Sequence, residues 1–244
     1  MLEAIGVIPA RYRSVRFPGK ALADLLGKPL IQHVYQRSRM AGTLSRLVVA
    51  TDDERIHRVV RDFGGEAVMT SPDHPSGTDR LAEVAAKLSV PLFVNIQGDE
   101  PLVDPRDIDA LVGALRSDAT IGMATLRRAI VDEEDLRSPH VVKLVVDRAG
   151  RALYFSRSPI PYLRKGLEFQ SYRHVGLYAY RRELLLEIAA APSGALESAD
   201  QLEQLRVLEM GRSIRVLDAH GESVGVDTPE DLRRVEALLE ASVN

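Results

Sequence analysis

The chain has 244 residues, 45% hydrophobic and 27% charged, which is ordinary for a soluble globular protein and long enough for one large α/β domain, or a domain with a lobe. The formal net charge of −3 provides no domain-wide positive field, so we expect no nucleic-acid partner. The absence of cysteine excludes disulfides, thiolate nucleophiles and Cys-ligated zinc.

The sequence gives no sign of membrane insertion. The N-terminus lacks a basic stretch followed by an apolar core, and no run of about 18 apolar residues occurs. We therefore expect a cytoplasmic protein that makes no membrane contact, and the lack of cysteine fits a reducing compartment.

Strands and helices alternate over roughly residues 1–120. Residues 46–51, RLVVAT, have the continuous apolar character of a strand buried on both faces. Residues 53–64 place four apolar side chains on one helical face, and a Gly pair ends that helix. This alternation predicts a mostly parallel sheet flanked by helices. The other elements predicted here are strands at 5–8, 66–69 and 91–97 and helices at 30–41, 81–88 and 108–115.

From residue 121 the pattern changes to strands in close succession, which predicts a smaller mixed α+β lobe. The predicted elements are strands at 121–129, 141–147, 152–155 and 173–180, a hairpin turn at 147–150, and helices at 184–190, 202–210 and 229–239. Asp227 or Thr228 would cap the last helix. We interpret residues 1–244 as one domain with a nucleotide-holding half (about 1–120), the mixed lobe (about 121–225) and a closing helix (226–244).

A loop rich in cations follows the first predicted strand. It carries Arg11, Arg13, Ser14, Arg16, Gly19 and Lys20. Because ligands of open α/β sheets lie beyond the carboxyl ends of the strands, this loop is well placed to bind phosphates. It is not the common phosphate loop, and no GxGxxG occurs, which argues against a P-loop NTPase and a dinucleotide-binding dehydrogenase. The alternative is a surface loop whose charges are only solvated.

Two carboxylates are candidate ligands for a magnesium ion. Asp99 follows the predicted strand 91–97 at its carboxyl end, where it could bind Mg²⁺ opposite a triphosphate, since hard cations take carboxylate and phosphate oxygens. Asp227 in GVDTPEDL is the second candidate. An Asp before Thr-Pro-Glu is also typical of a helix N-cap, and the two roles are compatible.

The remaining polar candidates are less specific. Arg157 ends a strand before two prolines and could point into a cleft or lie on the surface. His174 is a lone histidine on a strand, a pattern more often structural than functional. Glu203 and Gln204 are adjacent on a predicted helix, so at least one should be partly solvated. No Ser-His-Asp series and no HExxH stands out, which argues against hydrolytic triads and zinc enzymes.

Taken together, these segments resemble the sugar-acid cytidylyltransferases, and in particular the family that acts on 3-deoxy-manno-octulosonate (KDO). The motifs that carry the resemblance are PARYRSVRFPGK, ATDDERI, HPSGTDRLAEV, NIQGDEPL, ALYFSRSPIP, RHVGLYAY, LEQLRVLE and GVDTPEDL. They occur in the family's order from about residue 4 to residue 240. Each motif alone is weak, whereas eight in register are specific.

The resemblance implies a Rossmann-like nucleotidyltransferase fold and transfer of a cytidylyl group from CTP to the anomeric hydroxyl of KDO, giving CMP-KDO and pyrophosphate for lipopolysaccharide biosynthesis. It implies Mg²⁺ as cofactor and a homodimer formed through the mixed lobe. Arg11, Lys20, Asp99 and Asp227 would be catalytic, with the metal held by Asp99 and Asp227. Ala10, Arg11, Ser14, Arg16, Lys20, Gly77, Thr78 and Arg80 would bind the nucleotide, and Gln97, Arg157, His174, Tyr178, Glu203 and Gln204 the sugar acid.

The identity of the acceptor stays open. Asp200 stands where the resemblance leads us to expect a Glu, and Ala199 is small, so an 8-amino variant of KDO or another sugar acid is an alternative. A cytidylyltransferase for a polyol phosphate and a nucleotide-binding regulator without activity are the rival functions. The paired Asp99 and Asp227 argue against the regulator.

Overall fold

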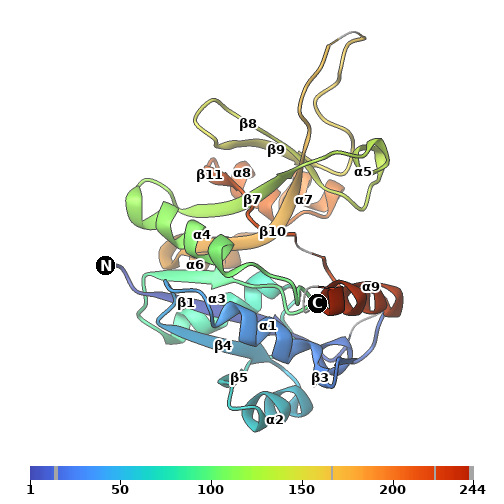
Figure 1. Cartoon of the computed structure of the whole chain (residues 1–244). Helices are drawn as coiled ribbons and strands as arrows, with labels where there is room; N and C mark the ends of the chain where they lie inside the picture. Colours follow the sequence, from blue (N-terminus) through green and yellow to red (C-terminus); the bar gives the residue numbers. More distant parts are fainter. Residues whose placement is uncertain (14–15, 166, 223, 242–244) are drawn as a thin grey trace.

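The computed structural model describes residues 1–13, 16–165, 167–222 and 224–241, and one mixed sheet runs through the whole molecule (Figure 1). Its strands lie in the order β11 (Ile214–Asp218), β7 (Met123–Ala129), β10 (Tyr172–Arg181), β6 (Leu92–Asn95), β1 (Ala4–Ala10), β4 (Arg46–Thr51) and β5 (Ala67–Met69). Strands β6, β1, β4 and β5 are parallel, as predicted. Strand β10 is antiparallel to both β6 and β7, so it joins the parallel part to the mixed part.

The central strand β1 is buried on both faces. Ile5 and Val7 pack on one face with the helices α3 (Gly77–Lys87) and α6 (Arg182–Ala190). Ala4 and Ile8 pack on the other face with α1 (Leu30–Ser38), α2 (Glu54–Asp62) and α4 (Pro105–Ser117). Two buried faces explain why these strands are continuous apolar runs. The arrangement leaves the carboxyl end of β1 free to receive a ligand.

The mixed part of the sheet continues into a small antiparallel extension. Strand β8 (Lys143–Val146) pairs with the start of β10 and with β9 (Ala152–Ser156). Three short helices accompany it: α5 (Glu133–Arg137), α7 (Ala195–Asp200) and α8 (Gln204–Glu209). Residues 157–165 and 167–171, which we call the arm, lie between β9 and β10 and project away from the sheet (Figure 1).

The C-terminal helix α9 (Pro229–Ala241) packs against the first half. Val226 and Val235 are fully buried against Leu25, in the small hairpin of β2 (Asp24–Leu25) and β3 (Lys28–Pro29), and Leu30, which follows that hairpin. The 3₁₀ turn η1 (Lys20–Leu22) precedes that hairpin. Helix α9 therefore brings the end of the chain beside the cationic loop that follows β1.

Most predicted elements are present within a few residues of their expected bounds, and β4 has the predicted bounds. The prediction missed β11, the β2–β3 hairpin, α5 and α7, and it started the helix at α8 two residues too early. No helix among the described residues combines the length and the hydrophobicity that crossing a bilayer requires.

Candidate active site

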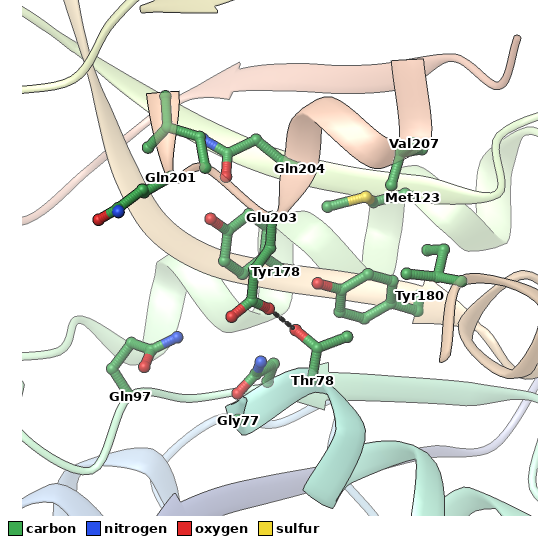
Figure 2. A pocket seen from close by; sticks show the side chains of 13 residues that line it. Gly77, Thr78, Gln97, Met123, Tyr178, Tyr180, Gln201, Glu203, Gln204 and Val207 are labelled. Carbon is green, nitrogen blue, oxygen red and sulfur yellow. Dashed lines mark hydrogen bonds between the residues drawn. The ribbon is translucent and has the colours of Figure 1, made fainter. Parts of the chain in front are cut away.

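Two cavities lie side by side at the carboxyl ends of β1 and β6. The cationic cavity, about 230 Å³, is lined by Pro9, Ala10, Arg11, Arg13, Lys20, Ala21, Gly77, Gln97, Gly98 and Asp99. The amide–hydroxyl cavity, about 220 Å³, is lined by Gly77, Thr78, Asn95, Gln97, Met123, Tyr178, Tyr180, Ile188, Gln201, Leu202, Glu203, Gln204 and Val207 (Figure 2). Gly77 and Gln97 line both, so a ligand in one cavity can meet a ligand in the other.

Lys20 lies between the two predicted metal ligands. Its Nζ is 2.6 Å from Oδ2 of Asp99 and 3.0 Å from Oδ1 of Asp227. Burial by itself lowers the pKa of Lys20, but the Asp99 carboxylate, followed by that of Asp227, more than offsets this and raises the pKa above its usual value. Lys20 is therefore a fixed positive charge at neutral pH.

Two glycines allow Lys20 and Asp99 to come this close to each other. Gly19 has φ 74°, the left-handed conformation from which η1 starts. A Cβ on Gly98 would lie 2.8 Å from the carbonyl oxygen of Pro9, so only glycine lets the chain before Asp99 pass this close to β1. Lys20 and Asp99 come from distant parts of the sequence, and these close turns bring them together.

The carboxylate of Asp227 can bind a cation because Thr228, and not Asp227, caps α9. Thr228 Oγ1 accepts a hydrogen bond from the Asp231 amide, and Asp231 Oδ2 accepts one from the Thr228 amide, which makes a capping box. The Val226 amide donates to the carbonyl oxygen of Asp99 at 2.8 Å, so Asp227 lies next to Asp99. Its carboxylate also pairs with Arg16 at 2.8 Å.

The pair Asp99 and Asp227 fits a magnesium ion that also binds a substrate phosphate. Both carboxylates face one ammonium nitrogen and are therefore close to each other. No group of three or more His, Cys, Asp or Glu side chains suited to a metal exists within the described part of the chain. Mg²⁺ commonly takes one or two protein carboxylates and completes its shell with water and phosphate oxygens, so this donor set is sufficient only with a phosphate present.

The other predicted nucleotide residues do not all lie together. Gly77 lines both cavities, whereas Thr78 lines only the amide–hydroxyl cavity. Ala10 and Arg11 line the cationic cavity, and Arg11 Nη1 donates to the carbonyl oxygen of Pro75 at 3.2 Å, while its buried Nη2 has no partner. Arg80 lines neither cavity; it is fully buried, pairs with Asp52 at 3.3 Å and hydrogen-bonds Thr70. Ser14 lies outside the described residues.

The amide–hydroxyl cavity contains polar atoms that no protein group satisfies. Asn95 is 2% exposed and Gln204 5% exposed, and neither Asn95 Oδ1 nor Gln204 Nε2 has a hydrogen-bond partner. Buried polar groups are nearly always paired, so these atoms indicate a polar ligand. Burial raises the pKa of the Tyr178 and Tyr180 phenols, which therefore remain neutral hydroxyls.

A hydrogen bond across the amide–hydroxyl cavity joins the two halves of the molecule. Thr78 Oγ1, in the first turn of α3, donates to Glu203 Oε2 at 2.7 Å (Figure 2). Glu203 is exposed whereas Gln204 is buried, which agrees with the expectation that at least one of the two is partly solvated, and both line this cavity. Tyr180 lies within hydrogen-bonding reach of Thr78 and Asn95.

His174 lines a separate cavity of about 180 Å³, which we call the His174 cavity and which also includes Glu100, His140, Val141, Val142, Arg173, Val175 and Gly176. The Tyr178 ring, whose centroid is 5.3 Å from that of His174, lines the amide–hydroxyl cavity, whereas His174 does not. Its Nε2 lies 3.0 Å from Thr125 Oγ1. Burial lowers the pKa of His174 to about 3, so the imidazole is neutral.

Arg157 points to main-chain carbonyls. Its Nε donates to the carbonyl oxygen of Asp200 at 2.8 Å and its Nη1 to that of Pro139 at 2.9 Å. It lines none of the three cavities described above. These contacts and a third, from Nη2 to the carbonyl oxygen of Gln201 at 3.5 Å, use three of the five N–H donors of the guanidinium. Its predicted contact with the sugar acid stays a prediction.

The sequence analysis did not select Asn95, Tyr180 or Gln201, although all three line the amide–hydroxyl cavity. For Asn95 a signal existed, because it is the polar residue inside the otherwise apolar segment PLFVNIQ. A polar side chain in a buried strand needs a partner, and a ligand can supply one.

Comparisons with known proteins identify relatives along the whole chain. The family profile described as cytidylyltransferase matches residues 5–214. The 3-deoxy-manno-octulosonate cytidylyltransferase of Geobacter metallireducens is 53% identical over 98% of each chain, and that of Solibacter usitatus is 50% identical over 99% of this chain and 96% of its own. The solved structure of CMP:2-keto-3-deoxy-manno-octonic acid synthetase complexed with CTP has a TM-score of 0.95 at 46% identity, covering 98% and 99% of the two chains. A 4-diphosphocytidyl-2C-methyl-D-erythritol synthase from Anaerococcus prevotii, 13% identical with a TM-score of 0.66 over 98% of this chain and 96% of its own, shares the fold.

Proposed function

The chain belongs to the cytidylyltransferase family, and from this premise we propose that it transfers the cytidylyl group of CTP to the anomeric hydroxyl of KDO, giving CMP-KDO and pyrophosphate. The acceptor is proposed from the relatives' names, because several that are at least 50% identical over nearly their full length are 3-deoxy-manno-octulosonate cytidylyltransferases. The product would be the activated sugar used in lipopolysaccharide biosynthesis.

The observation that carries the proposal is the contact between two cavities of different chemistry. The cationic cavity suits a polyphosphate, and the amide–hydroxyl cavity suits a ligand with many hydroxyl groups. Because Gly77 and Gln97 line both, a sugar hydroxyl in one cavity can approach a phosphorus atom in the other. This is the arrangement that group transfer between two bound substrates requires.

In the proposed reaction the sugar hydroxyl attacks the α-phosphorus in line and pyrophosphate leaves. Lys20 and Arg11 offset the negative charge on the phosphate oxygens, Lys20 as a point charge and Arg11 as a planar group with several donors. Gln97, Tyr178 and Gln204 orient the acceptor. The protein does little covalent chemistry, so position and fixed charge account for the catalysis.

We propose that the enzyme depends on Mg²⁺ held by Asp99 and Asp227. Asp99 and Asp227 would hold the ion, which when bound would supply Lewis-acid polarisation of the reacting phosphoryl group. Lys20 would supply a fixed positive charge beside the phosphates. The support is the convergence of both carboxylates beside the cationic cavity.

We further propose a homodimer in the cytoplasm. The arm carries exposed apolar side chains, with Tyr162 89%, Leu167 66% and Phe169 50% exposed. Clusters of this kind mark interaction sites, and a second copy of the chain is the partner we assign. The absence of cysteine is consistent with a reducing compartment.

The test of the proposed function is product identification by mass spectrometry after incubation with CTP, Mg²⁺ and one acceptor at a time. The panel is KDO, 8-amino-KDO, a nonulosonic acid and ribitol phosphate. We expect CMP-KDO and pyrophosphate with KDO, and loss of both when the metal is chelated. Turnover with ribitol phosphate but not with KDO would refute the choice of acceptor.

A further inference from the structure

Lys143, on β8, is a buried cation that the proposed reaction does not use. Its side chain is 0% exposed, and its Nζ donates to the carbonyl oxygens of Ser138 at 2.8 Å, Val141 at 2.6 Å and Arg157. An ammonium has three protons, so these acceptors satisfy it completely. Burial lowers the pKa of Lys143, and the nearby Arg157 charge lowers it further, while Asp200 acts in the opposite direction.

Arg157 extends the same set of contacts. Its carbonyl oxygen accepts from Lys143, and its guanidinium donates to the carbonyl oxygens of Pro139 and Asp200. The two cations therefore connect three chain segments: the loop 138–141, the end of β9 and the turn 200–201. Charged donors bind carbonyl oxygens more strongly than neutral donors do, so these contacts hold the segments firmly.

The connected segments form walls of two cavities. Val141 lines the His174 cavity, and Gln201 lines the amide–hydroxyl cavity. Gln201 has φ 52°, a strained conformation for a residue other than glycine. The Arg157 contact with the Asp200 carbonyl fixes the chain immediately before this residue. Lys143 itself lines neither of these cavities, so any effect it has on a ligand passes through these segments.

We propose that Lys143 is a positioning residue for the acceptor. Its ammonium, acting with Arg157, holds the loop 138–141 and the turn 200–201 in the positions that shape the His174 cavity and the amide–hydroxyl cavity. This inference rests on the proposed function, since it takes the amide–hydroxyl cavity as the acceptor site. No residue of the connected segments lines the cationic cavity, so the binding of CTP does not depend on Lys143.

The test compares two variants of Lys143: Lys143→Met removes the charge, whereas Lys143→Gln keeps an amide donor. Lys28→Met, at an exposed lysine, is the control. Initial rates would be measured with CTP and KDO varied in turn. We expect Lys143→Met to raise the KM for the acceptor at least tenfold with the KM for CTP unchanged within twofold. Lys143→Gln should show a smaller rise, and Lys28→Met none.

Hydrogen–deuterium exchange gives a second readout that does not depend on activity. We expect faster exchange in Lys143→Met at residues 138–142 and 200–204, with no change at residues 4–13. An unchanged acceptor KM in both variants, or a loss of kcat alone, would overturn the proposal. Failure of both variants to fold would also count against it, because Lys143 would then support the whole chain. If wild-type protein forms no CMP-KDO, the proposed function fails, and the exchange data alone decide whether Lys143 holds the two segments.

Discussion

Asp227 meets two cations, the Lys20 ammonium at 3.0 Å and the Arg16 guanidinium at 2.8 Å, yet its side chain is 45% exposed. Exposed ion pairs contribute only about 0.2–1 kcal/mol to stability, whereas loss of a charge at a phosphoryl-transfer site removes electrostatic stabilisation of the transition state. We therefore expect Asp227→Asn to lower kcat at least 10²-fold, on the order of the loss when one such stabilising group is removed. The free energy of unfolding should change by less than about 1 kcal/mol.

Asp218→Asn is the matched control for this prediction. Asp218 pairs with Arg127 at 2.8 Å and is 74% exposed, but it lies at the end of β11, outside both cavities. Steady-state rates and urea unfolding of the two variants would separate the effects. Equal activity of the two variants would remove Asp227 from the catalytic groups.

The half-buried imidazole of His174 makes stability depend on pH. Its pKa is lowered to about 3, against 6.5 for an ordinary histidine, so between these values the unfolded chain binds a proton that the folded chain does not. The contribution of this group to stability is therefore complete above pH 6.5 and is lost as the pH falls toward 3. Linkage gives a loss of about 2 kcal/mol between pH 7 and pH 5.

His174→Gln isolates this contribution because its amide can still donate to Thr125 Oγ1 without titrating in this range. We expect the difference in unfolding free energy between wild type and variant to fall by about 2 kcal/mol from pH 7 to pH 5 in urea titrations. A difference that stays constant with pH would mean that the imidazole is solvated and titrates normally.

At the scale of elements, the capping box of α9 both stabilises that helix and places Asp227. Thr228→Ala removes the side chain that accepts from the Asp231 amide and should cost about 1 kcal/mol of stability. Activity should fall as well, because the residue before the cap carries the carboxylate that we propose to be catalytic. Asp104→Ala, which removes the cap of α4 outside both cavities, is the control. We expect similar destabilisation without loss of turnover, and equal turnover in both variants would contradict the link between cap and site.

Elements with a complete hydrophobic period could be predicted from the sequence, whereas elements that depend on a distant partner could not. The six apolar-rich residues of β4 predict a strand because both of its faces are buried. Strand β11 has only Ile214 and Val216 buried, too short a period to detect, and it exists because β7 supplies its hydrogen bonds. The antiparallel insertion of β10 between β6 and β7 is likewise a long-range pairing that no local pattern indicates.

The candidate site shows the same limit. Lys20 is 79 positions from Asp99 and 207 from Asp227, so residue spacing alone cannot join them, and the resemblance to a family suggested that they meet. The ambiguity of Asp227 between cap and ligand depended on whether Thr228 would take the cap, which is a matter of side-chain geometry. The contacts of Arg157 with main-chain carbonyl oxygens could not be predicted from the sequence either, because every residue carries such an oxygen and its residue type gives no signal.

At the scale of the whole molecule, the arm exposes apolar side chains that the rest of the described chain does not cover. It leaves the sheet between β9 and β10 and carries Tyr162 and Phe169 with 89% and 50% of their surface exposed. Burial of aromatic side chains between two copies would remove this apolar surface from water, at roughly 25 cal/mol per Å². A dimer formed in this way would bring the mixed lobes of the two copies together.

We expect wild-type protein to sediment as a dimer at micromolar concentration and the double variant Tyr162→Ser, Phe169→Ser to sediment as a monomer. Because a dimer is stabilised by mass action, the melting temperature of the wild type should rise with protein concentration and that of the variant should not. Met40→Ser, which removes another exposed apolar side chain (72%), on the first half, should leave the dimer intact. A wild-type monomer, or a double variant that remains dimeric, would exclude the arm as the interface.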